Sequence, residues 1–200
     1  PWRIEPFSAA RLPALLDGWN RIFFGQRNFL PLTRGWFGAH VTEHRAFDPA
    51  GLVLAVADDQ LVGLAHFLRH GGDTAHGGNG GSLPPHGTLA LLAVADDWRR
   101  KGVATALLDQ GRRYLGDLPL VADGQCYNPF YGNSELPEPP LFGTPEGISL
   151  PWEDEASRDF FSRHGFPSQH QGITLCLELL PSAQPRPRED PAKVEILASR

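Results

Sequence analysis

The sequence contains no apolar run long enough to span a membrane, and its N-terminus lacks the apolar stretch of a signal peptide. It contains only two cysteines, Cys126 and Cys176, and each lies in an apolar run typical of a strand. We expect buried free thiols in a reducing compartment rather than a disulfide scaffold. The sequence therefore predicts a cytoplasmic protein with no membrane contact.

An excess of positive charge is also missing, because the formal net charge is −5 at pH 7. An acidic chain is a poor match for nucleic acid, so we expect no nucleic-acid partner. A hydrophobic content of 41% and 20% charged residues are typical of a globular protein. Two hundred residues suit one α/β domain with a full core and a tail.

Two common phosphate-binding motifs are absent. No Gly-x-x-x-x-Gly-Lys-(Ser/Thr) occurs, which excludes a P-loop. The glycine-rich run at 77–81 does not complete Gly-x-Gly-x-x-Gly, and no compact βαβ unit surrounds it. We interpret that run as the tip of a hairpin.

One stretch does favour phosphate binding. Three consecutive cations, Arg99, Arg100 and Lys101, follow an apolar strand and lie where an amphipathic helix, from about Lys101 to Leu115, is expected to begin. Gly102 and Ala104 keep the first turn of that helix almost free of side chains. Helix N-termini offer unpaired N–H groups and a partial positive charge, so the stretch predicts a pyrophosphate cradle.

The spacing Arg99-x-x-Gly102-x-Ala104 resembles the (Gln/Arg)-x-x-Gly-x-(Gly/Ala) signature of the GNAT superfamily of N-acetyltransferases. In that superfamily the signature binds the pyrophosphate of acetyl-CoA. A second stretch, 153–166, resembles the family's Asn-x-x-Ala-x-x-Phe-Tyr-x-x-x-Gly-Phe, and departs from it with Glu153 for Asn and Phe161 for Tyr.

Hydrophobic periodicity, taken without the motif, predicts a mixed α/β sheet with one central parallel pair, the strands that end at Val94 and Cys126. The resemblance implies a GNAT-like acyl-CoA N-acyltransferase fold in which these two strands splay apart. The first expected elements are a strand at Trp2–Phe7, a helix capped by Ser8 that runs through Trp19, and a helix from about Gly35 to Arg45 capped by Thr33. Strands at Gly51–Ala57, Gln60–Arg69 and Thr88–Val94 follow, and after them the motif helix and a strand at Leu118–Cys126. The last elements are a helix from about Asp154 to His164, with Gly165 as its left-handed cap, and a strand at Ile173–Leu180.

We expect one acetyltransferase domain over residues 1–180, with an insertion at 127–152 whose aromatic residues favour a packed cap lining the acceptor side of the pocket. Residues 181–200 are predicted to be a proline-rich linker or C-terminal tail. Its apolar ending leaves open a following domain or docking onto a neighbour, and a homodimer is possible.

The resemblance implies that acetyl-CoA is the co-substrate, that no metal is needed, and that the acetyl group passes directly to a primary amine in a ternary complex. The residues expected to bind the coenzyme are Leu92, Ala93, Val94, Arg99, Arg100, Lys101, Gly102, Val103, Ala104, Thr105, Phe160 and Phe161. The acceptor is a small-molecule or peptide amine that the sequence does not identify.

Acid–base groups are less clearly marked. Glu153, Asp123 and His86 are the candidates for the base, and Glu153 has the best positional argument because the family equivalent borders the coenzyme arm. Phe161 cannot supply the acid that the family's tyrosine would, so Tyr127 or Tyr131 is expected to replace it.

Two other functions remain open. The chain could be a coenzyme-A-binding domain of a larger protein without chemistry. His40-Val41-Thr42-Glu43-His44 also fits His-x-x-Glu-His, in which two histidines on one helix face bind zinc and Glu43 acts as base. The zinc hypothesis leaves the basic glycine turn unexplained.

Overall fold

The computed structural model describes residues 1–25, 29–71, 84–122, 129–131, 150 and 153–168. The chain divides into residues 1–168 and residues 169–200, and only the first part is described. Both cysteines, the strand expected at Ile173–Leu180 and the predicted tail therefore lie outside the described residues.

Within the described residues, five strands form one sheet in sequence order: β1 (Arg3–Pro6), β2 (Leu52–Ala57), β3 (Gln60–His70), β4 (His86–Val94) and β5 (Leu120–Ala122). The first three pairings are antiparallel, and β4 pairs parallel to β5. The mixed sheet and its parallel pair are thus confirmed. The described pairing covers Gly87 to Leu89 of β4, so the expected splaying further along falls on residues 123–126, which are not described.

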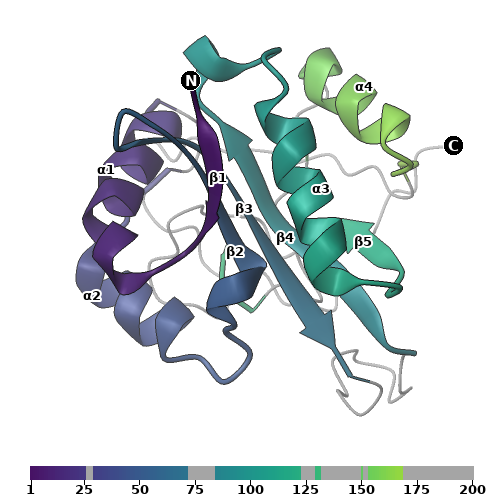
Figure 1. The fold of residues 1–200 in the computed structure, drawn as a ribbon, viewed down its shortest axis with the longest axis horizontal. Helices are drawn as coiled ribbons and strands as arrows, with labels where there is room; N and C mark the ends of the chain where they lie inside the picture. Colours follow the sequence, from purple (N-terminus) through teal and green to yellow (C-terminus); the bar gives the residue numbers. More distant parts are fainter. Residues whose placement is uncertain (26–28, 72–83, 123–128, 132–149, 151–152, 169–200) are drawn as a thin grey trace, which may run out of the picture. The chain divides into compact units, whose positions relative to one another are not determined.

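The helices lie on the two faces of this sheet (Figure 1). On one face are α1 (Leu12–Ile22), α2 (Arg34–Phe37) and a π-helical continuation, η2 (Gly38–Thr42). On the other are α3 (Val103–Leu115) and α4 (Glu155–Arg163). Short 3₁₀ turns occur at η1 (Ala9–Arg11), η3 (Pro49–Gly51) and η4 (Asp96–Trp98). None of the described helices is long and apolar enough to cross a membrane.

The core beneath α1 and α2, which we call the α1-side core, is rich in large aromatic side chains. Trp19, Phe37, Phe130 and Tyr131 are completely buried within it. Phe130 and Tyr131 belong to the stretch that we expected to be a cap, and Tyr131 lies with its ring 5.1 Å from that of Trp19. Phe130 and Tyr131 of the expected insertion therefore belong to the domain core and are not part of a cap that could be removed without disturbing the core.

The core beneath α3 and α4, the α3-side core, consists mostly of aliphatic residues. Leu107 and Leu108 of α3 are completely buried there, and Phe67 of β3 is nearly so. A Cβ at Gly111 would lie 2.0 Å from the Phe67 ring, so only glycine allows α3 to approach β3 this closely. The register of the motif helix on the sheet is fixed by this contact.

Two predicted helix features are wrong. Ser8 precedes η1 but its side chain makes no capping hydrogen bond. The helix expected to continue to Arg45 ends at Thr42 with π-helical geometry. The Gly38 carbonyl accepts hydrogen bonds from the Thr42 hydroxyl at 3.2 Å and from the Glu43 N–H at 3.0 Å, and the second of these has the i→i+5 spacing of a π-helix.

Two other caps are confirmed. The Thr33 hydroxyl accepts a hydrogen bond from the Trp36 N–H at 3.2 Å, which caps α2. Gly165 has φ of +85° just past α4, as a left-handed glycine cap requires.

Candidate functional site

The turn between β4 and α3 holds two residues in left-handed backbone conformations. Arg100 has φ of +59° and Gly102 has φ of +81°. Because Gly102 cannot join the helix in this conformation, α3 begins at Val103 and not at Lys101 as predicted. Lys101, which was expected to begin the helix, therefore precedes it together with Arg99 and Arg100.

The N-terminus of α3 is open. Its first intrahelical bond runs from the Ala106 N–H to the Gly102 carbonyl at 3.0 Å. The N–H groups of Val103, Ala104 and Thr105 come before that bond and have no acceptor within the helix. Gly102 provides no side-chain cap, and a Cβ placed on it would meet nothing within 4 Å. This arrangement suits an anion that accepts several backbone hydrogen bonds.

The cations around the opening differ in their partners. Arg99 places Nη2 3.1 Å from the Asp96 carboxylate and donates from Nε to the Val94 carbonyl at 3.4 Å. Lys101 holds Nζ 5.0 Å from the centre of the Trp98 ring. Arg100 is exposed on the strained backbone. Arg100 and Lys101 therefore supply most of the uncompensated positive charge at the opening.

The last residues of β4 lie beyond its described pairing with β5, which ends at Leu89. The Ala95 N–H donates to the Val62 carbonyl of β3 at 2.9 Å. Since backbone groups of successive strand residues point to alternate sides, Ala93 also faces β3, whereas Leu92 and Val94 face away from it. A bulge in the pairing of β3 with β4 precedes this segment, where Phe67 pairs with Leu89 and His66 with Leu91.

The helix α4 borders the same opening. Its N-cap, Asp154, accepts hydrogen bonds from the Ser157 N–H at 3.0 Å and hydroxyl at 2.7 Å. The pKa of Asp154 is lowered mainly by the Ser157 hydroxyl, with smaller contributions that include the charge of Arg99, which places this end of α4 near the turn. Glu153, the predicted base, is exposed immediately before the cap. Phe160 and Phe161 are half-buried and pack on the α3-side core.

The other acid–base candidates lie elsewhere. His86 begins β4, eight residues and roughly 26 Å from Val94, at the opposite end of the strand from the turn. Asp123 and Tyr127 fall outside the described residues. The Tyr131 hydroxyl lies 2.8 Å from Nδ1 of His66, and burial raises the Tyr131 pKa, which makes this hydroxyl a poor acid.

His66 is a buried polar residue that the sequence analysis did not single out. Its side chain is completely buried and stacked on Phe130 with ring centres 4.6 Å apart. Burial lowers the pKa of His66 to about 3, so the imidazole is neutral at pH 7. Its position among the apolar residues of β3 was the available signal, since such a pattern indicates a buried histidine.

The histidines of the predicted zinc motif do not share a regular helix face. His40 lies within the π-helical turn with its ring 4.8 Å from that of Trp36. His44 follows the end of the helix, and its Nδ1 accepts from the Ala46 N–H at 3.1 Å. Across the part of the chain that the structure describes, no group of three or more His, Cys, Asp or Glu side chains could hold a metal ion.

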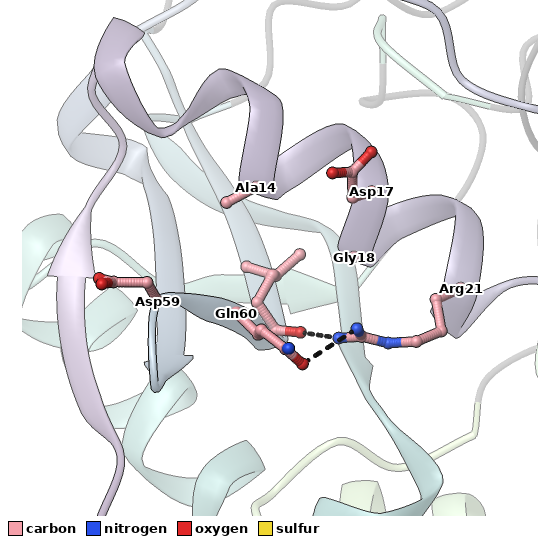
Figure 2. A pocket seen from close by; sticks show the side chains of 7 residues that line it. Ala14, Asp17, Gly18, Arg21, Asp59 and Gln60 are labelled. Atoms are coloured by element: carbon pink, nitrogen blue, oxygen red, sulfur yellow. Dashed lines mark hydrogen bonds between the residues drawn. The ribbon is translucent and has the colours of Figure 1, made fainter.

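A pocket of about 280 Å³ lies between α1 and the turn joining β2 to β3 (Figure 2). Arg21 crosses it and donates to the Gln60 side chain at 3.3 Å and to the Leu61 carbonyl at 2.6 Å. None of the predicted site residues lines this pocket; its lining residues are Ala14, Asp17, Gly18, Arg21, Asp59, Gln60 and Leu61.

The strand–turn–helix unit with its open N-terminus lies inside a region that matches a known family. Residues 12–120, more than half of the chain, match the family model described as the acetyltransferase (GNAT) family. The chain belongs to this family. It is accordingly an N-acetyltransferase of the kind that uses acetyl-CoA. No curated protein matches the sequence significantly.

Solved structures with the same fold include several acetyltransferases. An aminoglycoside 6'-N-acetyltransferase from Acinetobacter haemolyticus is 16% identical, with a TM-score of 0.53 over 88% of this chain and 99% of that one. An aminoglycoside N-acetyltransferase in complex with CoA is 16% identical, with a TM-score of 0.54 over 90% and 96%. The ribosomal-protein-S18-alanine N-acetyltransferase from Escherichia coli is 14% identical, with a TM-score of 0.51 over 85% and 80%. At these identities the likeness establishes the fold alone.

Proposed function

We propose that the protein transfers the acetyl group of acetyl-CoA to a primary amine by direct attack in a ternary complex. The observation that carries this proposal is the open N-terminus of α3 behind Gly102, bordered by Arg100 and Lys101. The acceptor is a small-molecule or peptide amine. Solved structures with the same fold include enzymes for both classes of acceptor: one is an aminoglycoside 6'-N-acetyltransferase, and another acetylates the alanine of ribosomal protein S18.

The coenzyme's pyrophosphate would accept hydrogen bonds from the N–H groups of Val103, Ala104 and Thr105. A helix N-terminus carries about half a positive charge, and the neighbouring cations add to it. Local concentration of positive charge is needed here, since the whole chain has a formal net charge of −5. The turn therefore supplies affinity for a polyanion that the protein as a whole would repel.

The pantetheine arm would run along the edge of β4 that faces away from β3, beyond the described pairing with β5. The N–H and carbonyl of Leu92 and the N–H of Val94 face away from β3 and can pair with amides of the arm. Phe160 and Phe161 border this region from α4. The contribution of the protein is then mainly placement of the thioester beside the amine, together with polarisation of the carbonyl by backbone N–H groups.

Acid–base assistance is expected to be modest. Glu153 is the proposed base, acting through water on the attacking amine, because it lies at the start of α4 next to the turn. Phe161 has no proton to give to the leaving thiolate. A thiol with a pKa near that of free cysteine can take its proton from solvent at neutral pH, so turnover proceeds without a dedicated acid.

The proposal is tested by calorimetric titration of the full chain with acetyl-CoA, followed by a panel of amine acceptors monitored by release of the free thiol. We expect saturable binding and acceptor-dependent release. Binding without turnover across a broad panel of small-molecule and peptide amines would favour a binding domain without chemistry. Failure to bind acetyl-CoA would contradict the proposal.

A further inference from the structure

His164 connects the end of α4 to the first turn of α3. Its Nδ1 lies 2.8 Å from the Phe160 carbonyl, and its Nε2 lies 3.4 Å from the Thr105 hydroxyl. The carbonyl of His164 accepts a hydrogen bond from Arg112 at 2.7 Å. One residue is thus bonded to its own helix, to the third turn of α3 and to the turn that faces the proposed coenzyme site.

The chemistry of these partners fixes the direction of the bonds. A carbonyl oxygen can only accept, so Nδ1 of His164 carries a proton and donates to Phe160. In the neutral imidazole Nε2 then has no proton and must accept from the Thr105 hydroxyl. In the imidazolium ion Nε2 also carries a proton, and the bond reverses, with Nε2 donating to the hydroxyl oxygen.

This reversal matters for an anion at the N-terminus of α3. When Thr105 donates to His164, its hydroxyl proton is committed and its lone pairs are left for the ligand. When His164 donates to Thr105, the hydroxyl proton is released and can be donated to a phosphate oxygen. The same residue therefore switches the Thr105 hydroxyl between a group that offers an anion no proton and one that donates a hydrogen bond to it.

We propose that His164 is a positioning residue for the coenzyme and that it acts through the direction of the Thr105 hydroxyl. This inference rests on the proposed function, since it takes the coenzyme phosphates to lie at the first turn of α3. It predicts that the contribution of the Thr105 hydroxyl to coenzyme affinity depends on the charge of His164. Imidazole side chains change charge between about pH 5 and pH 8, so the dependence is measurable as a pH effect.

The other charged groups near His164 can be separated from this effect. From α3, Arg112 faces it and is itself 3.9 Å from Asp109. From α4, Arg163 and Asp159 are its charged neighbours along the helix. A coenzyme phosphate monoester also titrates near pH 6, and that effect is the same for every variant.

The test compares dissociation constants of coenzyme A for the wild type and Thr105→Val by calorimetry, at about pH 8 and about pH 5.5. The ratio of the two dissociation constants measures the contribution of the Thr105 hydroxyl to coenzyme affinity. The protonation of the ligand affects both constants equally and therefore cancels in the ratio. We expect a ratio near 1 at the higher pH and about tenfold tighter wild-type binding at the lower pH, a change of about 1.4 kcal/mol. Thr105→Ser retains a hydroxyl and should behave as the wild type does.

His164→Phe provides the matched control, because it keeps a ring against Phe160, whose centre lies 4.2 Å from that of His164, and removes both nitrogens. In this background the Thr105 hydroxyl is always released, so Thr105→Val should weaken binding about tenfold at both pH values. If the ratio of dissociation constants for Thr105→Val and the parent is independent of pH when residue 164 is His, the inference is overturned. A pH-dependent ratio that persists when residue 164 is Phe overturns it as well.

Failure of the proposed function and failure of this inference give different experimental results. If the wild type does not bind coenzyme A at either pH, the proposed function fails, and this inference fails with it. If the wild type binds but Thr105→Val has the same effect at both pH values, the coenzyme site stands and only the role of His164 is lost. Should His164→Phe not fold, as judged by circular dichroism, a pH-independent ratio in the His164 background still overturns the inference.

Discussion

The two faces of the sheet are built on different principles. The α1-side core brings together aromatic residues from segments far apart in the chain, such as Trp19 of α1 and Tyr131 after β5. It also holds His66, a buried polar group with a single described hydrogen bond, to Tyr131. The α3-side core is aliphatic and centres on a local strand–turn–helix unit, in which Val103 and Leu107 of α3 pack on β3.

This difference separates stability from coenzyme binding. The proposed coenzyme site combines backbone groups at the start of α3 and the edge of β4 with the charges of Arg100 and Lys101, and the α3-side core holds α3 and β4 in place. Among the described apolar residues expected to bind the coenzyme, Ala93 packs against the α1-side core, and most of the others pack in the α3-side core. Substitutions in the α1-side core should therefore change stability and its pH dependence, whereas substitutions at the turn should change coenzyme affinity.

The largest effect is expected from Phe130→Ala in the α1-side core. Phe130 is completely buried against His66, so its loss should lower the free energy of unfolding by about 3–5 kcal/mol. Leu150→Ala, in the same expected insertion but 42% exposed at Leu150, should change stability little. Urea denaturation of both variants measures the difference. Similar, small losses for the two would mean that residues 127–152 do form a separable cover.

A pH effect on stability should come next. The pKa of His66 is lowered to about 3 in the folded protein from an ordinary value of 6.5. The unfolded chain therefore binds one more proton than the folded chain between these values, and stability falls as the pH falls from about 6.5 toward 3. The slope should reach about 1.4 kcal/mol per pH unit from this residue.

The control for that effect replaces both partners of the buried hydrogen bond. His66→Leu combined with Tyr131→Phe removes the titrating group and leaves neither partner unsatisfied, so stability at pH 7 should change little. The double variant should lose most of the decline between pH 6.5 and pH 4, measured by urea denaturation at each pH. An unchanged decline would assign it to other groups and contradict the burial of a neutral imidazole.

The smallest effect is expected at Phe161, which stands at the family's tyrosine position on α4. If solvent protonates the leaving thiolate, Phe161→Tyr should leave turnover within a few-fold of the wild type or raise it. Tyr127→Phe belongs in the same assay. A loss of about 100-fold or more in that variant, with coenzyme binding intact, would show that the chain has moved its acid to Tyr127.

The contrast between the two faces also explains what could be predicted from the sequence. The β4–α3 unit is local, so its strand, its basic turn and its helix could be recognised within 30 residues. The start of α3 was misplaced by two residues because the left-handed conformation of Gly102 is decided by the turn. Non-local contacts were less accessible: neither the burial of Phe130 in the core nor its stacking on His66 follows from periodicity.

The site was predicted unevenly for the same reason. Backbone groups at a helix start follow from the chain direction alone: Arg99 and Gly102 lie in the turn before α3 and Ala104 lies in its first turn, while their binding of the coenzyme stays a prediction. Side-chain chemistry depends on how distant elements meet, which is why His86 was considered as a base although it begins β4 at its far end. The bond between His164 and Thr105 likewise joins residues 59 positions apart and had no signal in the sequence.

The central claim, that the open N-terminus of α3 binds the coenzyme pyrophosphate, is tested most directly by comparing Gly102→Glu with Gly102→Ala. Both variants carry a Cβ at a residue with φ of +81°, so they share the backbone strain, and a Cβ there has nothing within 4 Å. Only the glutamate places a carboxylate against the phosphates. Calorimetric titration with acetyl-CoA should show affinity weaker for glutamate than for alanine by at least about 2 kcal/mol, with both folded by circular dichroism. Equal affinities for the two folded variants would contradict the account.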